Sequence, residues 1–164
     1  MPDTLTSTVP GAIGVLSTYL ANVATANPSL ECGTYVGIPV ATVTNNYMMV
    51  GNYENGQLIQ NYLQTWAGLP AVANRKNEQY EILGTIRTWD GSSSPVNRLT
   101  DAFTLLDGVM SQFANDPNGS GAITPSGTWS VGGVELPSSG PFGGKGWGAL
   151  ITFTVTVINV RLTA

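Results

Sequence analysis

The sequence ALITFTVTVINVRL, residues 149–162, decides the fold, because apolar and polar side chains alternate along it. Neighbouring side chains of a β-strand point to opposite faces, and Val, Ile, Thr and Phe favour strands. The stretch therefore predicts a long strand whose apolar face carries Ala149, Ile151, Phe153, Val155 and Val157. The opposite face carries threonines and then turns aliphatic at Ile158, which predicts that the end of the strand is covered.

Two further stretches predict strands in the second half of the chain. Tyr80–Trp89 alternates in the same way, with one face formed by Tyr80, Ile82, Gly84 and Ile86. Gly127–Leu136 predicts a short strand, followed by an extended loop over Pro137–Gly148.

The region before residue 77 is less regular. Tyr35–Val43 predicts an edge strand, because Pro39 cannot donate a hydrogen bond to a neighbouring strand. Tyr47–Val50 predicts a return strand after the Asn45-Asn46 turn. Residues 57–76 fit either a short helix or the arm of a long hairpin.

Two stretches predict amphipathic helices. The first begins at Pro10, ends at Asn27-Pro28, and has one apolar stripe made of Ile13, Leu16, Leu20 and Val23. The second spans Pro95–Asn115, and its stripe consists of Val96, Leu99, Phe103, Leu106, Met110 and Phe113. The whole order predicts one α+β domain over residues 1–164. In it, two helices pack on one face of a mostly antiparallel sheet, with long loops between the elements.

The composition excludes most catalytic chemistry. Charged residues make up 10% of the chain, there is no histidine, and Cys32 is the one cysteine. Catalytic triads and Cys–His pairs need histidine, and a single cysteine is too few for a zinc site. The net charge of −4 disfavours binding to nucleic-acid phosphates. We therefore expect no enzymatic activity, no catalytic residue, no cofactor and no metal.

Paired carboxylates are the catalytic device that this composition leaves open. Their spacing places no two of them across a cleft, so we expect solvated surface groups. The ten acids are Asp3, Glu31, Glu54, Glu78, Glu81, Asp90, Asp101, Asp107, Asp116 and Glu135.

Aromatic and methionine side chains gather in segments that are rich in turns and glycine. Such residues with few charges nearby are typical of interface cores, although they fit equally well as satellite core packed over the sheet edges. The scarcity of charge favours an interface with other subunits. The candidate interface residues are Tyr47, Met48, Met49, Tyr53, Trp66, Trp129, Phe142 and Trp147.

The N-terminal region gives no strong membrane or export signal. No apolar stretch approaches the ~20 residues that span a bilayer. Ala24-Thr25-Ala26 is similar to a signal-peptidase site, but the segment before it has Asp3 and no basic residue. We therefore expect a helix of the domain here and no contact with a membrane.

The order and lengths of the elements resemble those of tail terminator, or tail completion, proteins of long-tailed bacteriophages. The resemblance covers most of the chain as a pattern of elements, without a signature motif. It is carried by Pro10–Asn27, Glu81–Asp90, Pro95–Asn115 and Gly148–Leu162.

The resemblance implies a structural subunit that forms a ring with its own copies, commonly a hexamer. Such a ring ends the tail tube and presents a joining surface to a neck or head-completion protein. It would lie at the tail–neck junction of a virion assembled in the host cytoplasm, and DNA would pass an acidic lumen without specific binding. The alternatives are another neck connector or minor tail protein, or a binding module that uses loop aromatics. A small hydrolase with two carboxylates is a further alternative.

Overall fold

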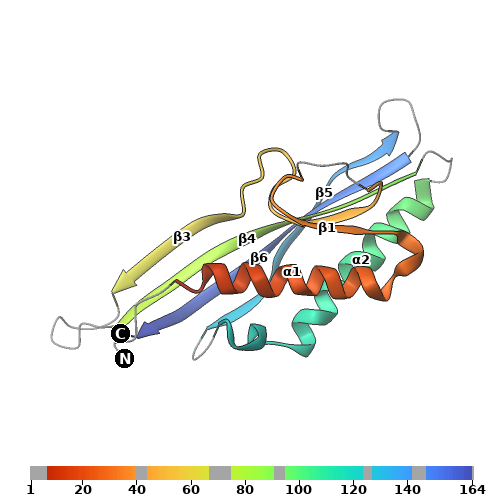
Figure 1. Cartoon of the computed structure of the whole chain (residues 1–164). Helices are drawn as coiled ribbons and strands as arrows, with labels where there is room; N and C mark the ends of the chain where they lie inside the picture. The colour runs from red at the N-terminus through yellow and green to blue at the C-terminus, as the bar shows by residue number, and fades with distance from the viewer. Residues whose placement is uncertain are drawn as a thin grey trace.

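The fold consists of one sheet with two helices on one of its faces, as expected for an α+β domain (Figure 1). The computed structural model describes residues 7–39, 44–66, 75–90, 95–123, 127–141 and 147–163. The side chains of residues 66, 75, 90, 95, 138–141, 147 and 159–163 are left undescribed. The helices are α1 (Val9–Ala26) and α2 (Pro95–Asn115), and the short 3-10 turns are η1 (Pro28–Leu30) and η3 (Gly119–Gly121).

The sheet is built around the long antiparallel pair β4 (Arg75–Asp90) and β6 (Trp147–Thr163). Its strand order is β1-β2-β4-β6-β5, where β1 is Gly33–Val36, β2 is Tyr47–Val50 and β5 is Thr128–Pro141. A further strand, β3 (Ile59–Trp66), pairs with the first half of β4, beside β2. The pairs are antiparallel except for β1 and β2.

The predicted faces of β4 and β6 are confirmed. Ala149, Ile151, Phe153, Val155 and Val157 are all buried in the cluster that lies between the sheet and the helices. Tyr80, Ile82 and Ile86 join the same cluster from β4. The prediction that the end of β6 is covered is wrong at Ile158, which is 41% exposed.

The first helix is confirmed, and its burial is one-sided. Ala12, Leu16, Tyr19, Leu20 and Val23 are its buried residues. By length and composition α1 could cross a membrane, which the sequence analysis did not anticipate. Its apolar face nevertheless lies in the core, which is how a helix packed within a folded domain uses such a stripe.

The second helix begins and ends at the predicted residues, but its apolar side chains divide into two groups. Leu106 and Phe113 are buried and Leu99 is half-buried, while Val96, Phe103 and Met110 are 67%, 42% and 46% exposed. The missing core positions are filled by Ala102, Leu105 and Val109. The predicted continuous stripe was therefore wrong, because Val96, Phe103 and Met110 lie on a flank of the helix that the sheet does not cover.

The first half of the sheet differs from the prediction in two ways. β1 and β2 run parallel, so Tyr47–Val50 is not the return strand of a hairpin, and β1 ends at Val36. Residues 40–43 of the predicted strand lie outside the described residues. The undecided segment at 57–76 contains a strand, β3, and the expected loop after Leu136 begins later because β5 continues to Pro141.

Glu78 is a buried acid and not the solvated surface group that we expected. Its side chain is 0% exposed and lies at the N-terminus of α1. Its Oε2 accepts hydrogen bonds from the Thr8 backbone N–H at 2.9 Å and the Thr8 hydroxyl at 2.7 Å, and its Oε1 accepts one from the Ser7 hydroxyl. Helix N-termini favour negative charge and leave backbone N–H groups unpaired. Glu78 therefore joins the start of α1 to β4, 70 residues away in sequence.

Candidate assembly surfaces

The structure places three of the candidate interface residues inside the subunit. Met48 and Met49, on opposite faces of β2, are 0% and 1% exposed, and Tyr47 is 9% exposed. Met48 belongs to the core beneath the helices. Tyr47 lies under Arg87, whose guanidinium carbon is 5.8 Å from the ring centroid. The satellite-core interpretation is therefore the one that fits β2, because both of its faces are covered.

Trp129 is also buried, at 5% exposure. Its ring contacts Phe113 at a centroid distance of 4.7 Å and Tyr19 at 5.6 Å, so that one aromatic cluster joins β5, α2 and α1. Its indole N–H donates to the Asp116 carbonyl oxygen at 3.3 Å. Trp129 therefore closes the core and does not face a partner.

The Asp116 carboxylate fixes the turn that follows α2. It accepts hydrogen bonds from the Ser120 hydroxyl and the Tyr19 hydroxyl, each at 2.7 Å. Backbone hydrogen bonding from Ser120, together with these two hydroxyls, lowers the pKa of Asp116 below its ordinary value. Burial and the nearby carboxylate raise the pKa of Tyr19.

The remaining candidates lie elsewhere in the fold. Tyr53 is half-buried, and its hydroxyl donates to Glu54 at 3.0 Å. Trp66 pairs with Lys76 at the end of β3, and Trp147 begins β6 opposite Asp90, but their side chains are among those left undescribed. Phe142 lies outside the described residues.

Among the described residues, the large apolar side chains that face solvent, apart from Ile158 on β6, lie on elements at two opposite edges of the sheet. On one side are β5 and the flank of α2, with Val134, Leu136, Val96, Phe103 and Met110 between 42% and 67% exposed. On the other side are β1 and β3, with Val36, Ile38, Tyr62 and Leu63 between 44% and 53% exposed. We call these sets the β5 side and the β1 side. The α2 part of the β5 side was not expected, because Val96, Phe103 and Met110 belonged to the stripe that was predicted to pack in the core.

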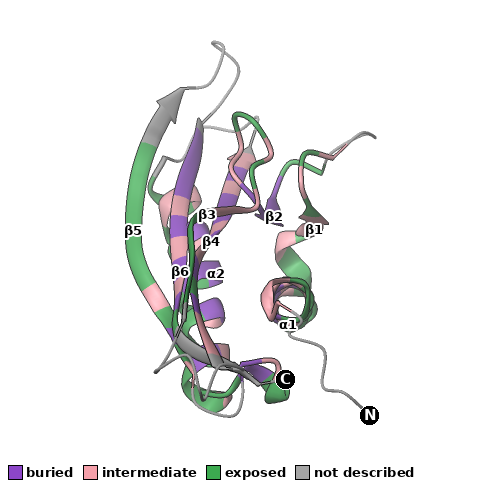
Figure 2. Ribbon diagram, turned by 90° about the vertical axis from the view of Figure 1, so that its left-hand side faces the viewer, coloured by how far each residue is buried: buried purple, intermediate pink, exposed green. Residues whose placement is uncertain are grey.

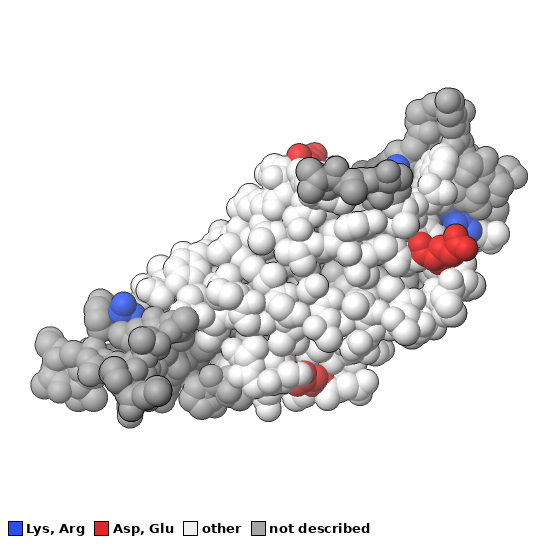
Figure 3. Space-filling model, viewed as in Figure 1, with Lys and Arg blue, Asp and Glu red and all other residues white. Residues whose placement is uncertain are grey.

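The face formed by the helices carries very little charge. α1 contains no acidic or basic residue along its 18 residues. In the view over the helices, acidic and basic atoms occupy only a few small areas of the described surface (Figure 3). Charge is depleted in the cores of protein interfaces, so this face is suited to contact with other protein.

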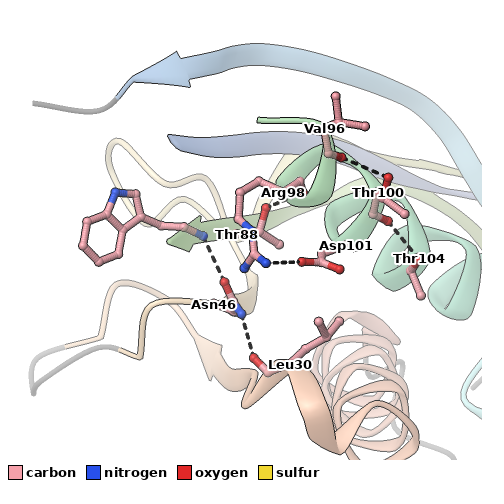
Figure 4. Close-up of polar contacts among 9 residues, drawn as sticks. Leu30, Asn46, Thr88, Val96, Arg98, Thr100, Asp101 and Thr104 are labelled. Atoms are coloured by element: carbon pink, nitrogen blue, oxygen red, sulfur yellow. Dashed lines mark hydrogen bonds and ion pairs between the residues drawn. The ribbon is translucent and has the colours of Figure 1, made fainter. Parts of the chain in front are cut away.

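Polar contacts around Asn46 and at the start of α2 lie on the helix side of the sheet, as Figure 4 shows. The Asn46 amide donates to the Leu30 carbonyl oxygen at 2.7 Å and accepts from the Trp89 backbone N–H at 2.9 Å. Close by, the Arg98 side chain contacts the Asp101 carboxylate at 2.9 Å within α2. The two Asn46 bonds hold the turn before β2 against Leu30 and β4, whereas the Arg98–Asp101 pair lies near the start of α2.

The opposite face of the sheet holds an open groove of about 410 Å³. It is lined by Glu54, Glu135, Thr152 and Thr154, among others. The spacing of the acids in the sequence did not predict that Glu54 and Glu135 share a site, whereas in the fold both line this groove. Among the described residues, no three His, Cys, Asp or Glu side chains gather as a metal site would need.

No protein-family model matches the chain, and no curated protein matches it.

Proposed function

We propose that the protein is a structural subunit whose copies form a ring that terminates a bacteriophage tail tube and supplies the surface for joining the head. The observation that carries the proposal is the separation of exposed apolar side chains into the β5 side and the β1 side. Single exposed apolar residues are ordinary, whereas exposed apolar residues on neighbouring elements, such as α2 and β5, are typical of interaction surfaces.

Two different surfaces on opposite sides of one subunit favour head-to-tail contacts. A two-fold dimer uses the same patch on both copies, whereas a head-to-tail contact joins two different patches and generates a ring when the rotation closes. The hexameric ring number comes from the resemblance to tail terminators. The low charge of the helix face fits subunits that bury much of their surface against neighbours.

The partners follow from the same proposal. One rim of the ring would contact the tail tube protein and the other a neck or head-completion protein, in a virion assembled in the host cytoplasm. DNA would pass through without specific binding, because the chain has a net charge of −4. Another neck connector or minor tail protein would use the same ring-forming surfaces.

The alternative of a binding module with loop aromatics has less support. Trp129, one of the aromatic residues that such a module could use, is 5% exposed and bonded within the core. The hydrolase alternative retains only the shared position of Glu54 and Glu135 on an open groove.

The experiment that tests the proposal measures the native mass of the purified protein and images it with isolated tail tubes. We expect closed rings, alone or on one end of the tubes. Phe103→Lys should abolish them, while Thr104→Lys, which adds the same charge to a neighbouring exposed residue of α2, should retain them. A chain that stays monomeric both alone and with tail tubes contradicts the proposal.

A further inference from the structure

We infer that strand β5 of one copy pairs antiparallel with strand β1 of the next copy, so that the sheet continues from subunit to subunit. This inference rests on the proposed self-assembly and names the strands that carry it. Five observations support it: the open edges, the row that joins them, the strand directions, the lengths of the edges and the absence of opposing charge.

Both strands have an open edge. β5 pairs with β6 on one side and β1 with β2 on one side, and within the described residues neither has a second partner. All six residues of β5 from Gly132 to Pro137 are exposed, and Figure 2 shows β5 at the opposite side of the sheet from β1. An unpaired strand edge presents a row of free N–H and C=O groups, which is a template for another strand.

The two edges end the same row of the sheet. The register places Val36 beside Val50, Val50 beside Gly84, Gly84 beside Phe153, and Phe153 beside Val134. The inner members of this row are buried, whereas Val36 and Val134 at its ends are 50% and 43% exposed. Neighbours in a row share a face, so both end valines lie on the helix side. A second copy placed along the row would bring these two valines together.

The strand directions agree with this pairing. β1 is parallel to β2, and the three successive pairs from β2 to β5 are antiparallel. β1 and β5 of one copy therefore run in opposite directions, and a copy placed head to tail keeps these directions. The contact would be antiparallel, which is the slightly more stable pairing and needs no crossover connection.

The lengths of the two edges also correspond. Bulges interrupt β5 between Val131 and Gly133 and again between Glu135 and Ser138, leaving the short regular stretch Gly133–Glu135. β1 has only four residues. Bulges in an edge strand hinder uncontrolled edge-to-edge aggregation. A contact between these two short edges would therefore admit one partner strand at each edge.

The side chains beside the two edges are compatible. α1 packs over β1, and α2 packs against β5, so a head-to-tail copy would bring α1 toward the apolar flank of Phe103 and Met110. The other half of the contact carries Asp107 on α2 and Glu135 on β5, both exposed. α1 and β1 have no charged residue, so no like charge would oppose these two acids. A standard interface buries about 800 Å² per partner, so a stable contact would need this helix surface as well as the short strand edges.

Cysteine pairs test the inference directly. All of these proteins carry Cys32→Ser, so that the native thiol cannot form a cross-link. Burial raises the pKa of the Cys32 thiol to about 11, so it would in any case react slowly. Opposed residues of an antiparallel pair have Cα atoms about 4.5–5.5 Å apart, which lies within the range of a disulfide. A mixture of the Val36→Cys and Val134→Cys proteins, oxidised with tail tubes present, should form a disulfide-linked heterodimer that neither forms alone.

The control mixes Val134→Cys with Ile158→Cys. Ile158 is exposed to a similar degree but lies on the other face of the sheet. This mixture should give no cross-link. Homodimers of Val134→Cys alone would overturn the inference in favour of a two-fold contact. Rings on tail tubes without a 36–134 cross-link would overturn it while leaving the proposed function intact, whereas monomers without rings would contradict both.

Discussion

Removing the Glu78 carboxylate should detach the start of α1 from the sheet. The structure gives this side chain, which is itself 0% exposed, three hydrogen bonds from the half-buried Ser7 and Thr8. Hydrogen bonds to a charged group contribute about 1.5–3 kcal/mol each, and a buried donor left without a partner costs about 1–3 kcal/mol. Helix N-terminal charge adds about 0.3–1 kcal/mol.

We therefore expect Glu78→Ala to lower the free energy of unfolding by about 4 kcal/mol and Glu78→Gln by about 2 kcal/mol, because glutamine retains one acceptor oxygen. The matched control is Glu81→Gln, three residues along the same strand. Glu81 accepts bonds from Gln60 and Asn61 on the more exposed face and should change stability by less than about 1 kcal/mol.

Urea unfolding followed by circular dichroism measures the three values. Hydrogen exchange adds a local test, since the Ala12 amide, which donates to the Thr8 carbonyl oxygen, should lose protection in Glu78→Ala. The reasoning is refuted if Glu78→Ala is no less stable than Glu81→Gln, because the buried carboxylate would then not hold the helix.

Two further changes test the core and the turn after α2. Gly84→Ala should destabilise the protein by about 1–3 kcal/mol in urea unfolding, because the added carbon would lie 2.2 Å from the Phe153 ring. Gly133→Ala, where nothing lies within 4 Å, is its control and should be close to neutral. Asp116 has a lowered pKa in the folded state, so it contributes stability above the unfolded-state pKa, near 3.8, that is lost as the pH falls through the folded-state value. Asp116→Asn should remove this part of the acid sensitivity in unfolding curves from pH 7 to pH 2, and an unchanged pH profile would contradict the bond to Tyr19.

The elements with a strong period were predictable from the sequence. Alternation fixed the inner face of β6 from Ala149 to Val157, and the helical spacing of Leu16, Leu20 and Val23 identified the buried face of α1. These patterns succeed because a side chain's place in a regular element is set by local geometry.

What failed depended on contacts between distant residues. The residues near Glu78 do not indicate that it contacts a helix N-terminus 70 residues earlier in the sequence. The burial of Glu78 could therefore not be predicted from its local sequence. The parallel pairing of β1 with β2 is a choice between two topologies that both suit short apolar strands. The apolar pattern of α2 is wider than the part of the helix that packs on the sheet. Phe103 therefore lies on the exposed flank of the helix.

The position of the exposed apolar residues could not be predicted from the composition, and the interface itself stays a prediction. The scarcity of charge favours an assembling subunit. However, two of the aromatic residues predicted for the contact, Tyr47 and Trp129, are buried within this chain. Composition reports how much surface is uncharged, whereas only the fold shows which residues remain uncovered after the core has formed.

Complementary blocking of the two edges tests the head-to-tail contact most directly. Val36→Lys and Val134→Lys each place a charge on one open edge and leave the other edge intact. We predict by native mass measurement that each variant alone remains at the 17.2 kDa of one chain, and that their equal mixture forms a dimer and no larger ring. Full rings from either variant alone, or no association in the mixture of variants while the unmodified chain forms rings, would contradict the account.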